Sequence, residues 1–132
     1  MAANHFLRPL LSTAAGEAHT LRVTGRTTVL ASAIDAAFDS ASRKRGLLGR
    51  NQLAAGTALV IAPCSGIHTF GMQFPIDVVF AARDGRVLKI ARAVGPRRIA
   101  VCLRAFAAIE FAAGEADRCG VRVGDFLELA AG

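Results

Sequence analysis

The dipeptide Asp84-Gly85, set between two apolar runs, is the feature that most constrains the fold of this chain. The runs are residues 76–81 (IDVVFA) and 87–94 (VLKIARAV), and both are rich in β-branched and other apolar side chains. Asp-Gly suits the positive φ angles of a tight turn between twisted antiparallel strands. The sequence therefore predicts a β-hairpin over these two runs.

Other short apolar segments, bounded by Gly, Pro or turn residues, predict further strands. They are residues 21–23, 27–30, 57–62, 67–72, 98–103, 106–111 and 125–129. Residues 114–120 are typical of a turn or a short helix. Basic side chains at every third position of residues 86–92 break the alternation of a regular strand, which predicts a bulge or an early strand end there.

One segment is typical of a helix instead. Ser32 stands three residues before Asp35, as in a capping box, and apolar residues then recur at helical spacing as far as Leu48. The cations at 43–45 complement the negative end of a helix just before Gly46. We therefore expect the main helix to begin at Ser32.

About seven or eight short strands with one main helix define an α+β, predominantly β domain, closed as a small barrel or packed as a sandwich. The length of 132 residues suits one domain, and no internal repeat or linker divides the chain. We expect the domain to span residues 20–132, after a flexible N-terminal arm at residues 1–19.

The charge is basic but unevenly placed. The chain carries 16 Lys and Arg against 10 Asp and Glu, and residues 83–104 alone hold seven basic side chains and one acidic one. Arg-rich surfaces attract phosphate, but the chain has no Trp or Tyr, and no aromatic residue interleaves this block. The pattern favours a solvated basic face and argues against nucleic-acid binding.

Three cysteines, an odd number without paired spacing, favour a reducing compartment. No apolar run is long enough to span a membrane. The N-terminus also lacks the early cations and the apolar run of an export signal. We therefore expect a cytoplasmic protein.

Polar and reactive side chains gather in the stretch 63–80, where Asp77 is the one charged residue. If this stretch is extended around His68, then His68 and Met72 project to the same face. Cys64 and His68, helped by Asp77 or another cysteine, are one potential metal site. A lone C-x3-H supplies only two ligands, fewer than zinc needs, so we predict no metal and no cofactor.

Three interpretations of these residues stay open. Cys64, activated by His68 and oriented by Asp77, would make a nucleophilic enzyme. A non-enzymatic binding module would instead recognise a small polar ligand or a protein partner. Its candidate residues are Arg50, Cys64, His68, Met72, Asp77 and Glu110. The third interpretation is structural, with Cys64 and Met72 in the core and His68 as a hydrogen-bonded wall residue. Asp77 would then be a cap or a buried bridge to an arginine.

The common nucleotide, hydrolase and metalloprotease fingerprints are absent from the sequence. The binding module is therefore the preferred function. An enzyme that uses Cys64 and His68 is the first alternative. The second is an interaction protein acting as a homodimer, because 53% of the residues are hydrophobic and an apolar surface is typical of such contacts.

Several ordered segments carry a compound signal. They are RKRGLLGR at 43–50, ALVIAPC at 58–64, IHTFGMQFPIDVVF at 67–80, DGRVL at 84–88, and AAG at 112–114 before GVRVGD at 120–125. Together they resemble domain of unknown function family 192 over residues 20–130. The resemblance implies a small β-rich domain with a helix, found as a stand-alone bacterial or archaeal protein with no established activity.

Individual positions can be matched to this family. The arginine of G-L-x-x-R, the central methionine, the P-I-D turn and the terminal G-D correspond to Arg50, Met72, Pro75 to Asp77, and Asp125. Cys64 and His68 resemble a P-C and I-H-T-F variant of the family pattern. Gly71 departs from it, since relatives carry a bulky residue there. Many relatives also begin with an export signal, which this N-terminus does not show.

Overall fold

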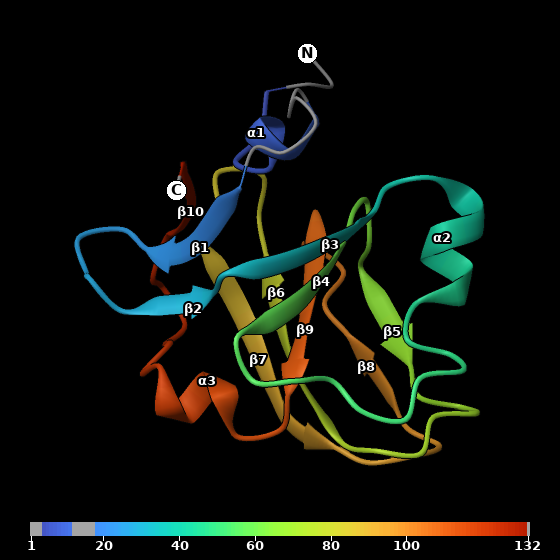
Figure 1. Ribbon diagram of the computed structural model, residues 1–132. Coiled ribbons are helices and arrows are strands. Elements are labelled where there is room, and N and C mark those ends of the chain that lie inside the picture. The colour runs from blue at the N-terminus through green and yellow to red at the C-terminus, as the bar shows by residue number, and fades with distance from the viewer. Residues whose placement is uncertain (1–3, 12–17, 132) are drawn as a thin grey trace.

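The computed structural model describes residues 4–11 and 18–131, which form ten strands and three short helices (Figure 1). A five-stranded sheet with the order β3-β4-β9-β6-β7 lies at the centre. Its strands are β3 (Ala33–Ala37), β4 (Thr57–Ile61), β6 (Ile76–Ala81), β7 (Val87–Val94) and β9 (Ala107–Ala112). β3 and β4 are parallel, and the other neighbouring pairs are antiparallel.

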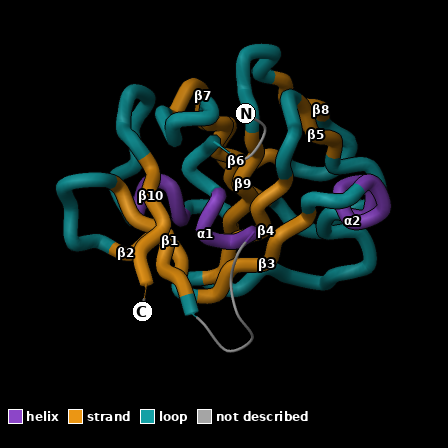
Figure 2. The backbone as a smooth tube through the Cα atoms, turned by 90° about the horizontal axis from the view of Figure 1, so that it is seen from above, coloured by secondary structure: helices purple, strands orange, loops and turns teal. Residues whose placement is uncertain are grey.

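Two smaller sheets lie on opposite sides of this central sheet (Figure 2). One has the order β10-β1-β2 and comprises β1 (His19–Val23), β2 (Val29–Ala31) and β10 (Leu127–Ala131). The other pairs β5 (Gly66–His68) with β8 (Ile99–Val101). The helices are α1 (Arg8–Leu11), α2 (Ser40–Arg45) and α3 (Glu115–Arg118). None of the helices in the described residues has the length and apolar character that crossing a membrane requires.

Alternation along the central strands creates two cores. Val60, Val79 and Ile109 pack on the side of the three-stranded sheet, whereas Val78 and Phe80 pack on the side of α2 and β5. This follows from the strand geometry, in which successive side chains point to opposite faces. Burying each large side chain contributes about 1.5 to 3 kcal/mol. The α+β, predominantly β class is confirmed, and the described strands form three sheets that close no barrel.

The predicted hairpin is confirmed with the boundaries that the sequence indicated. β6 and β7 pair as antiparallel neighbours, and Gly85 takes a φ of 90° in the turn between them. The Asp84 carboxylate accepts a hydrogen bond of 3.1 Å from the Arg86 N–H, which fixes the turn. The predicted irregularity is also present, since the register between the two strands shifts twice.

The helix predicted to begin at Ser32 is wrong in its first half. Residues 33–37 form β3, and the Asp39 carboxylate caps α2 by accepting a hydrogen bond of 2.7 Å from the Ser42 N–H. Pairing along the whole length of buried β4 outweighs the local capping signal, since tertiary contacts override weak helix propensity. The predicted helix end is confirmed, because Gly46 is the C-cap.

The predicted N-terminal arm contains residues 1–3 and 12–17, which lie outside the described residues. Within its described part, Leu7 is fully buried in the core on the side of the three-stranded sheet. The Phe6 N–H donates a hydrogen bond of 2.8 Å to the Arg83 carbonyl. Residues 4–11 therefore contact the body of the domain.

Candidate functional site

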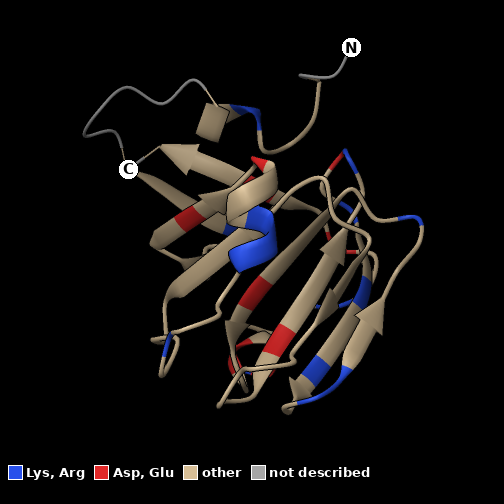
Figure 3. Cartoon of the chain, turned by 90° about the vertical axis from the view of Figure 1, so that its right-hand side faces the viewer, with Lys and Arg blue, Asp and Glu red and all other residues tan. Residues whose placement is uncertain are grey.

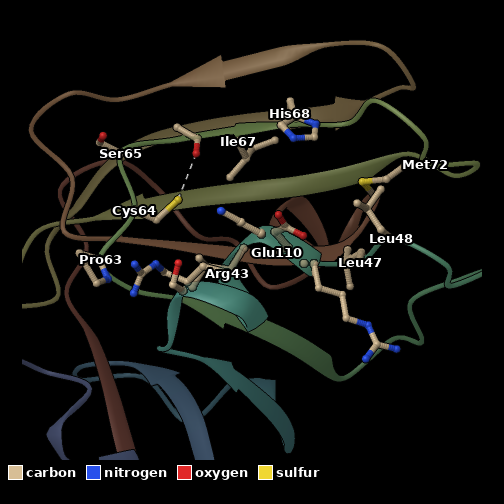
Figure 4. Close-up of a pocket in the computed structure, with 16 residues that line it drawn as sticks. Arg43, Leu47, Leu48, Pro63, Cys64, Ser65, Ile67, His68, Met72 and Glu110 are labelled. Atoms are coloured by element: carbon tan, nitrogen blue, oxygen red, sulfur yellow. Dashed lines mark hydrogen bonds between the residues drawn. The ribbon is translucent and has the colours of Figure 1, made fainter.

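A cavity of about 400 Å³ lies between α2 with the loop that follows it and the segment containing β5 (Figure 4). Its polar lining comprises Ser40, Arg43, Lys44, Arg45, Cys64, Ser65, His68 and Glu110. Its apolar lining comprises Leu47, Leu48, Ile61, Pro63, Ile67 and Met72. Four of the six candidate residues therefore meet here, namely Cys64, His68, Met72 and Glu110. A pocket of this size accepts a small organic molecule.

Glu110 supplies the pocket's buried carboxyl group. It lies on β9, opposite Leu59 of β4 and Val78 of β6, and is only 4% exposed. Its Oε2 atom is buried and has no hydrogen-bond partner among the described residues. Burial raises the pKa of Glu110 from 4.5 to about 7, although the nearby Arg50 charge works in the opposite direction. The group therefore changes protonation state near neutral pH.

Arg50 is close enough to act on Glu110 but does not line the cavity. Its Nη1 atom lies 3.2 Å from Oδ2 of Asp35 on β3, in an ion pair whose side chains are 40% and 53% exposed. An exposed ion pair of this kind contributes little stability. The predicted site residue Arg50 is thus a neighbour of the pocket, and its charge acts on Glu110 from outside the lining.

Cys64 is half-buried at the wall of the pocket. Its thiol donates a hydrogen bond of 3.2 Å to the Gly66 carbonyl, drawn as the dashed line in Figure 4. Burial raises the pKa of the Cys64 thiol, and the Glu110 charge adds to that effect, while the Arg43 charge lowers it. The thiol form is therefore favoured over the thiolate that a nucleophile needs.

His68 and Met72 reach the same pocket by different routes. His68 ends β5 and is exposed, and its ring centroid lies 5.5 Å from that of Phe70. The chain then turns, because the Met72 N–H donates to the Thr69 carbonyl, and Met72 is only 7% exposed. The prediction that His68 and Met72 share one face of an extended strand is wrong, since the strand ends at His68.

Asp77 lies outside the pocket lining and serves the fold. Its Oδ2 atom accepts hydrogen bonds of 3.0 Å from the N–H groups of both Gly114 and Ala116. Its Oδ1 atom accepts one of 2.8 Å from the N–H of Ala93. The side chain is 1% exposed, so it holds the start of α3 and the irregular end of β7 together. This matches the cap that the structural interpretation of Asp77 predicted.

The sequence interpretation did not include the cations of α2 among the site residues. Arg43, Lys44 and Arg45 all line the pocket, and the basic segment of α2 stands in front of the central sheet in Figure 3. Their clustering was visible in the sequence, but it matched the usual charge preference of a helix C-terminus. Only the structure shows that α2 lies over Glu110, so that these three cations also line the pocket.

No group of three or more His, Cys, Asp or Glu side chains within residues 4–11 and 18–131 is placed to hold a metal ion. The residues weighed for such a site are also divided between the two sides of the central sheet. Cys119 packs in the core on the side of the three-stranded sheet, whereas Cys64 packs on the opposite side.

The sequence model of domain of unknown function family 192, described as "Uncharacterized ACR", matches residues 20–129. The chain belongs to this family. The predicted resemblance is therefore confirmed over most of the chain. Membership itself adds no activity, because the family is defined without one. No curated protein matches the chain.

Two solved structures share the fold. The first is a protein of unknown function from Novosphingobium aromaticivorans, with a TM-score of 0.73 and 24% identity, covering 84% of this chain and 83% of that one. The second is from Sinorhizobium meliloti, is described as a "putative transcription regulator", and has a TM-score of 0.74 and 27% identity. The second match covers 85% of this chain and 92% of that one. Each of the two structures therefore has the same fold as this chain over most of its length.

Proposed function

We propose that this member of the family is a non-enzymatic binding module that takes a small polar ligand into the pocket between α2 and β5. The observation that carries the proposal is the buried Glu110 carboxyl group, whose Oε2 atom has no partner among the described residues. Leaving a buried polar atom unpaired costs about 1 to 3 kcal/mol. A ligand that supplies the missing hydrogen bond would recover that cost.

The rest of the lining supports the same proposal. Apolar side chains such as Leu47, Ile67 and Met72 make the pocket wall, and a few polar groups stand among them. Small-molecule sites have this mixture of an apolar wall with sparse polar groups that fix orientation. The proposed binding surface contains fewer residues than the sequence predicted, because neither Arg50 nor Asp77 lines the pocket.

The enzyme alternative has less support. It requires Cys64 to be an activated nucleophile, but the thiol donates to the Gly66 carbonyl rather than to His68. Burial, moreover, raises the pKa of Cys64. Activated cysteines have a lowered pKa and a base within hydrogen-bond reach.

The homodimer alternative is favoured by one observation. Ile99, Val101 and Leu103 are 66%, 42% and 84% exposed on β8 and just beyond it. Exposed apolar side chains that cluster in this way are typical of interaction surfaces. However, the neighbouring Arg98 and Arg104 are also exposed, so a symmetric pairing of two copies would bring like charges together. Light scattering tests this alternative, since a dimer should dissociate in the variant Leu103→Glu.

Two further inferences accompany the proposal. We infer that residues 20–132 form the functional domain, with residues 4–11 packed against its core, and that it acts in the cytoplasm. Cys64, Cys102 and Cys119 are all free, as a reducing compartment would leave them. Fractionation of cells that express the natural protein tests the location.

The binding proposal is tested by recording amide NMR spectra while adding small polyols, amines, carboxylates and phosphate esters at millimolar concentration. At least one class should shift the amides of α2 and β5. The variant Leu48→Trp narrows the pocket and should abolish the shifts, whereas Leu103→Trp, at an exposed position outside the lining, should keep them. No shift with any class, or the same shifts in Leu48→Trp, would refute the proposal.

A further inference from the structure

The charges around the pocket narrow the chemistry of its ligand, an argument that rests on the proposed function. Arg43, Lys44 and Arg45 line the cavity from α2, and within the described residues none of the three forms a salt bridge. Arg43 uses one N–H to donate a hydrogen bond of 2.7 Å to the Phe38 carbonyl, which leaves its other donors free for a ligand. Three cations around a cavity of about 400 Å³ favour an anion.

Glu110 requires a second kind of group on the same ligand, namely a hydrogen-bond partner. It is more than nine-tenths buried and lies in the middle of the drawn lining, with Cys64 on one side and Met72 on the other (Figure 4). Its free Oε2 atom needs a hydrogen-bond partner. An ammonium group would supply one only while Glu110 is ionised, and the Arg50 charge, which already acts on Glu110, would repel it.

A hydroxyl group meets the demand without added charge. It donates to Glu110 when the carboxyl is ionised, and it accepts from Glu110 when the carboxyl is protonated. Both states are populated near neutral pH, because the pKa of Glu110 is about 7. The apolar wall formed by Leu47, Ile67 and Met72 leaves room for hydrocarbon between the two polar ends of a ligand.

We propose that the pocket binds a small organic anion with an apolar middle and a hydroxyl group at its far end. The anionic group lies against Arg43, Lys44 and Arg45, and the hydroxyl group hydrogen-bonds to Glu110. Carboxylates and phosphates share the required anionic chemistry, and the test distinguishes them. No bond is made or broken in this step, so Cys64 and His68 act only as wall residues.

The probes are straight-chain omega-hydroxy carboxylates of increasing length, followed by amide NMR and calorimetry. For each length, the comparison compounds are the plain carboxylate, the omega-amino carboxylate, the diol and the omega-hydroxy alkyl phosphate. The best hydroxy anion should bind about tenfold more tightly than the plain carboxylate of the same length, the size expected for one hydrogen bond to a buried acid. The diol and the amino compound should bind more weakly than the hydroxy anion.

Two pairs of variants assign the roles of the protein side chains. Glu110→Leu should remove the preference for the hydroxyl while leaving the plain carboxylate bound, whereas Glu128→Gln, outside the lining, should keep the preference. Lys44→Gln should weaken every anion and leave the diol unchanged. Lys89→Gln makes the same charge change outside the lining and should have no effect.

The outcomes separate this inference from the proposed function. If plain or amino carboxylates bind as tightly as the hydroxy compounds, the ligand class is wrong although the pocket still binds small molecules. If only diols bind, the role of the α2 cations is wrong. If no probe of any class shifts the pocket amides, both this inference and the proposed function are overturned.

Discussion

Asp77 and Glu110 lie on the neighbouring strands β6 and β9, but their side chains point to opposite faces of the central sheet. Asp77 pairs directly with Phe111, so Glu110, one residue earlier on β9, takes the other face. Asp77 accepts three backbone hydrogen bonds, whereas Glu110 leaves a buried oxygen without a partner. One sheet thus carries an acid that serves the fold and an acid that is free to serve a ligand.

Asp77→Asn should destabilise the protein by about 2 to 3 kcal/mol, because an amide nitrogen cannot accept the hydrogen bonds that the lost carboxylate oxygen took. Urea unfolding monitored by circular dichroism gives the change in the free energy of unfolding. Asp117→Asn is the matched control. Its ion pair with Arg92 joins side chains that are 71% and 48% exposed, so its loss should cost less than about 1 kcal/mol. Equal effects at the two positions would contradict the structural role of Asp77.

The fold was predictable from the sequence where local residues determine the structure, and not where a distant strand does. The hairpin over residues 76–94 followed from local chemistry, since Asp84-Gly85 and the flanking strands specify their own pairing. The capping signal at Ser32 and Asp35 failed because it competes with pairing to β4, where Asp35 lies opposite Leu59, 24 residues further along the chain, and local propensity does not include such a partner. Local signals therefore predict local structure and miss pairings that are made at a distance.

The site was predictable only in part, for the same reason. Alternation along β9 predicts that the Glu110 side chain points to the face of the sheet opposite to Ile109 and Phe111. It does not predict which elements cover the face that carries Glu110. The covering elements are α2 and β5, which are remote in sequence. Cys64, His68 and Met72 were found because they are neighbours in the chain. The cations at 43–45 were assigned only to the helix dipole, and Asp77 was included because it is adjacent to the others in sequence.

Gly85→Ala should be far more harmful than Gly124→Ala, although both glycines have a positive φ, of 90° and 97°. A Cβ at Gly85 would collide with the Leu127 backbone carbonyl, whereas a Cβ at Gly124 meets nothing within 4 Å. We expect Gly124→Ala to cost about 1 to 2 kcal/mol from backbone strain alone. Gly85→Ala should cost at least about 2 kcal/mol more, because strand β10 must move. Thermal and urea unfolding measure both, and similar values would rule out the close approach.

Cys64 should react slowly with iodoacetamide at neutral pH, because burial raises the pKa of its thiol. The measurement uses a variant in which Cys102 and Cys119 are replaced by serine, with free glutathione as the reference. Adding Glu110→Gln should speed the reaction above pH 7, since the Glu110 charge raises the Cys64 pKa. A native rate above that of glutathione would restore the enzyme alternative.

Arg50→Gln should raise the pKa of Glu110 above its present value of about 7, because the Arg50 charge lowers it. Arg45→Gln is the matched control, since Arg45 lines the pocket but is not among the charges that shift the pKa of Glu110. Carboxyl carbon NMR of the labelled glutamate gives both titrations directly. An unchanged pKa in Arg50→Gln would show that Arg50 does not act on the pocket.

Glu110→Gln should change how stability depends on pH. In the wild type, the pKa of Glu110 is about 7 in the folded state and near its ordinary value of 4.5 when unfolded, so the folded protein holds the proton more tightly. The free energy of unfolding should therefore fall as pH rises from about 4.5 to 7, by an amount on the order of 2 to 3 kcal/mol. The glutamine side chain does not titrate, so Glu110→Gln should lose this decline and should exceed the wild type in stability at pH 8. Glu128→Gln should retain the decline. Urea unfolding at a series of pH values measures all three proteins.

A wild type that is equally stable across this interval would mean that Glu110 is ionised throughout, and that its Oε2 atom already has a partner in solution. A hydroxy anion that binds the pocket should raise the free energy of unfolding at every pH in this interval, because its hydroxyl group bonds to Glu110 in both protonation states.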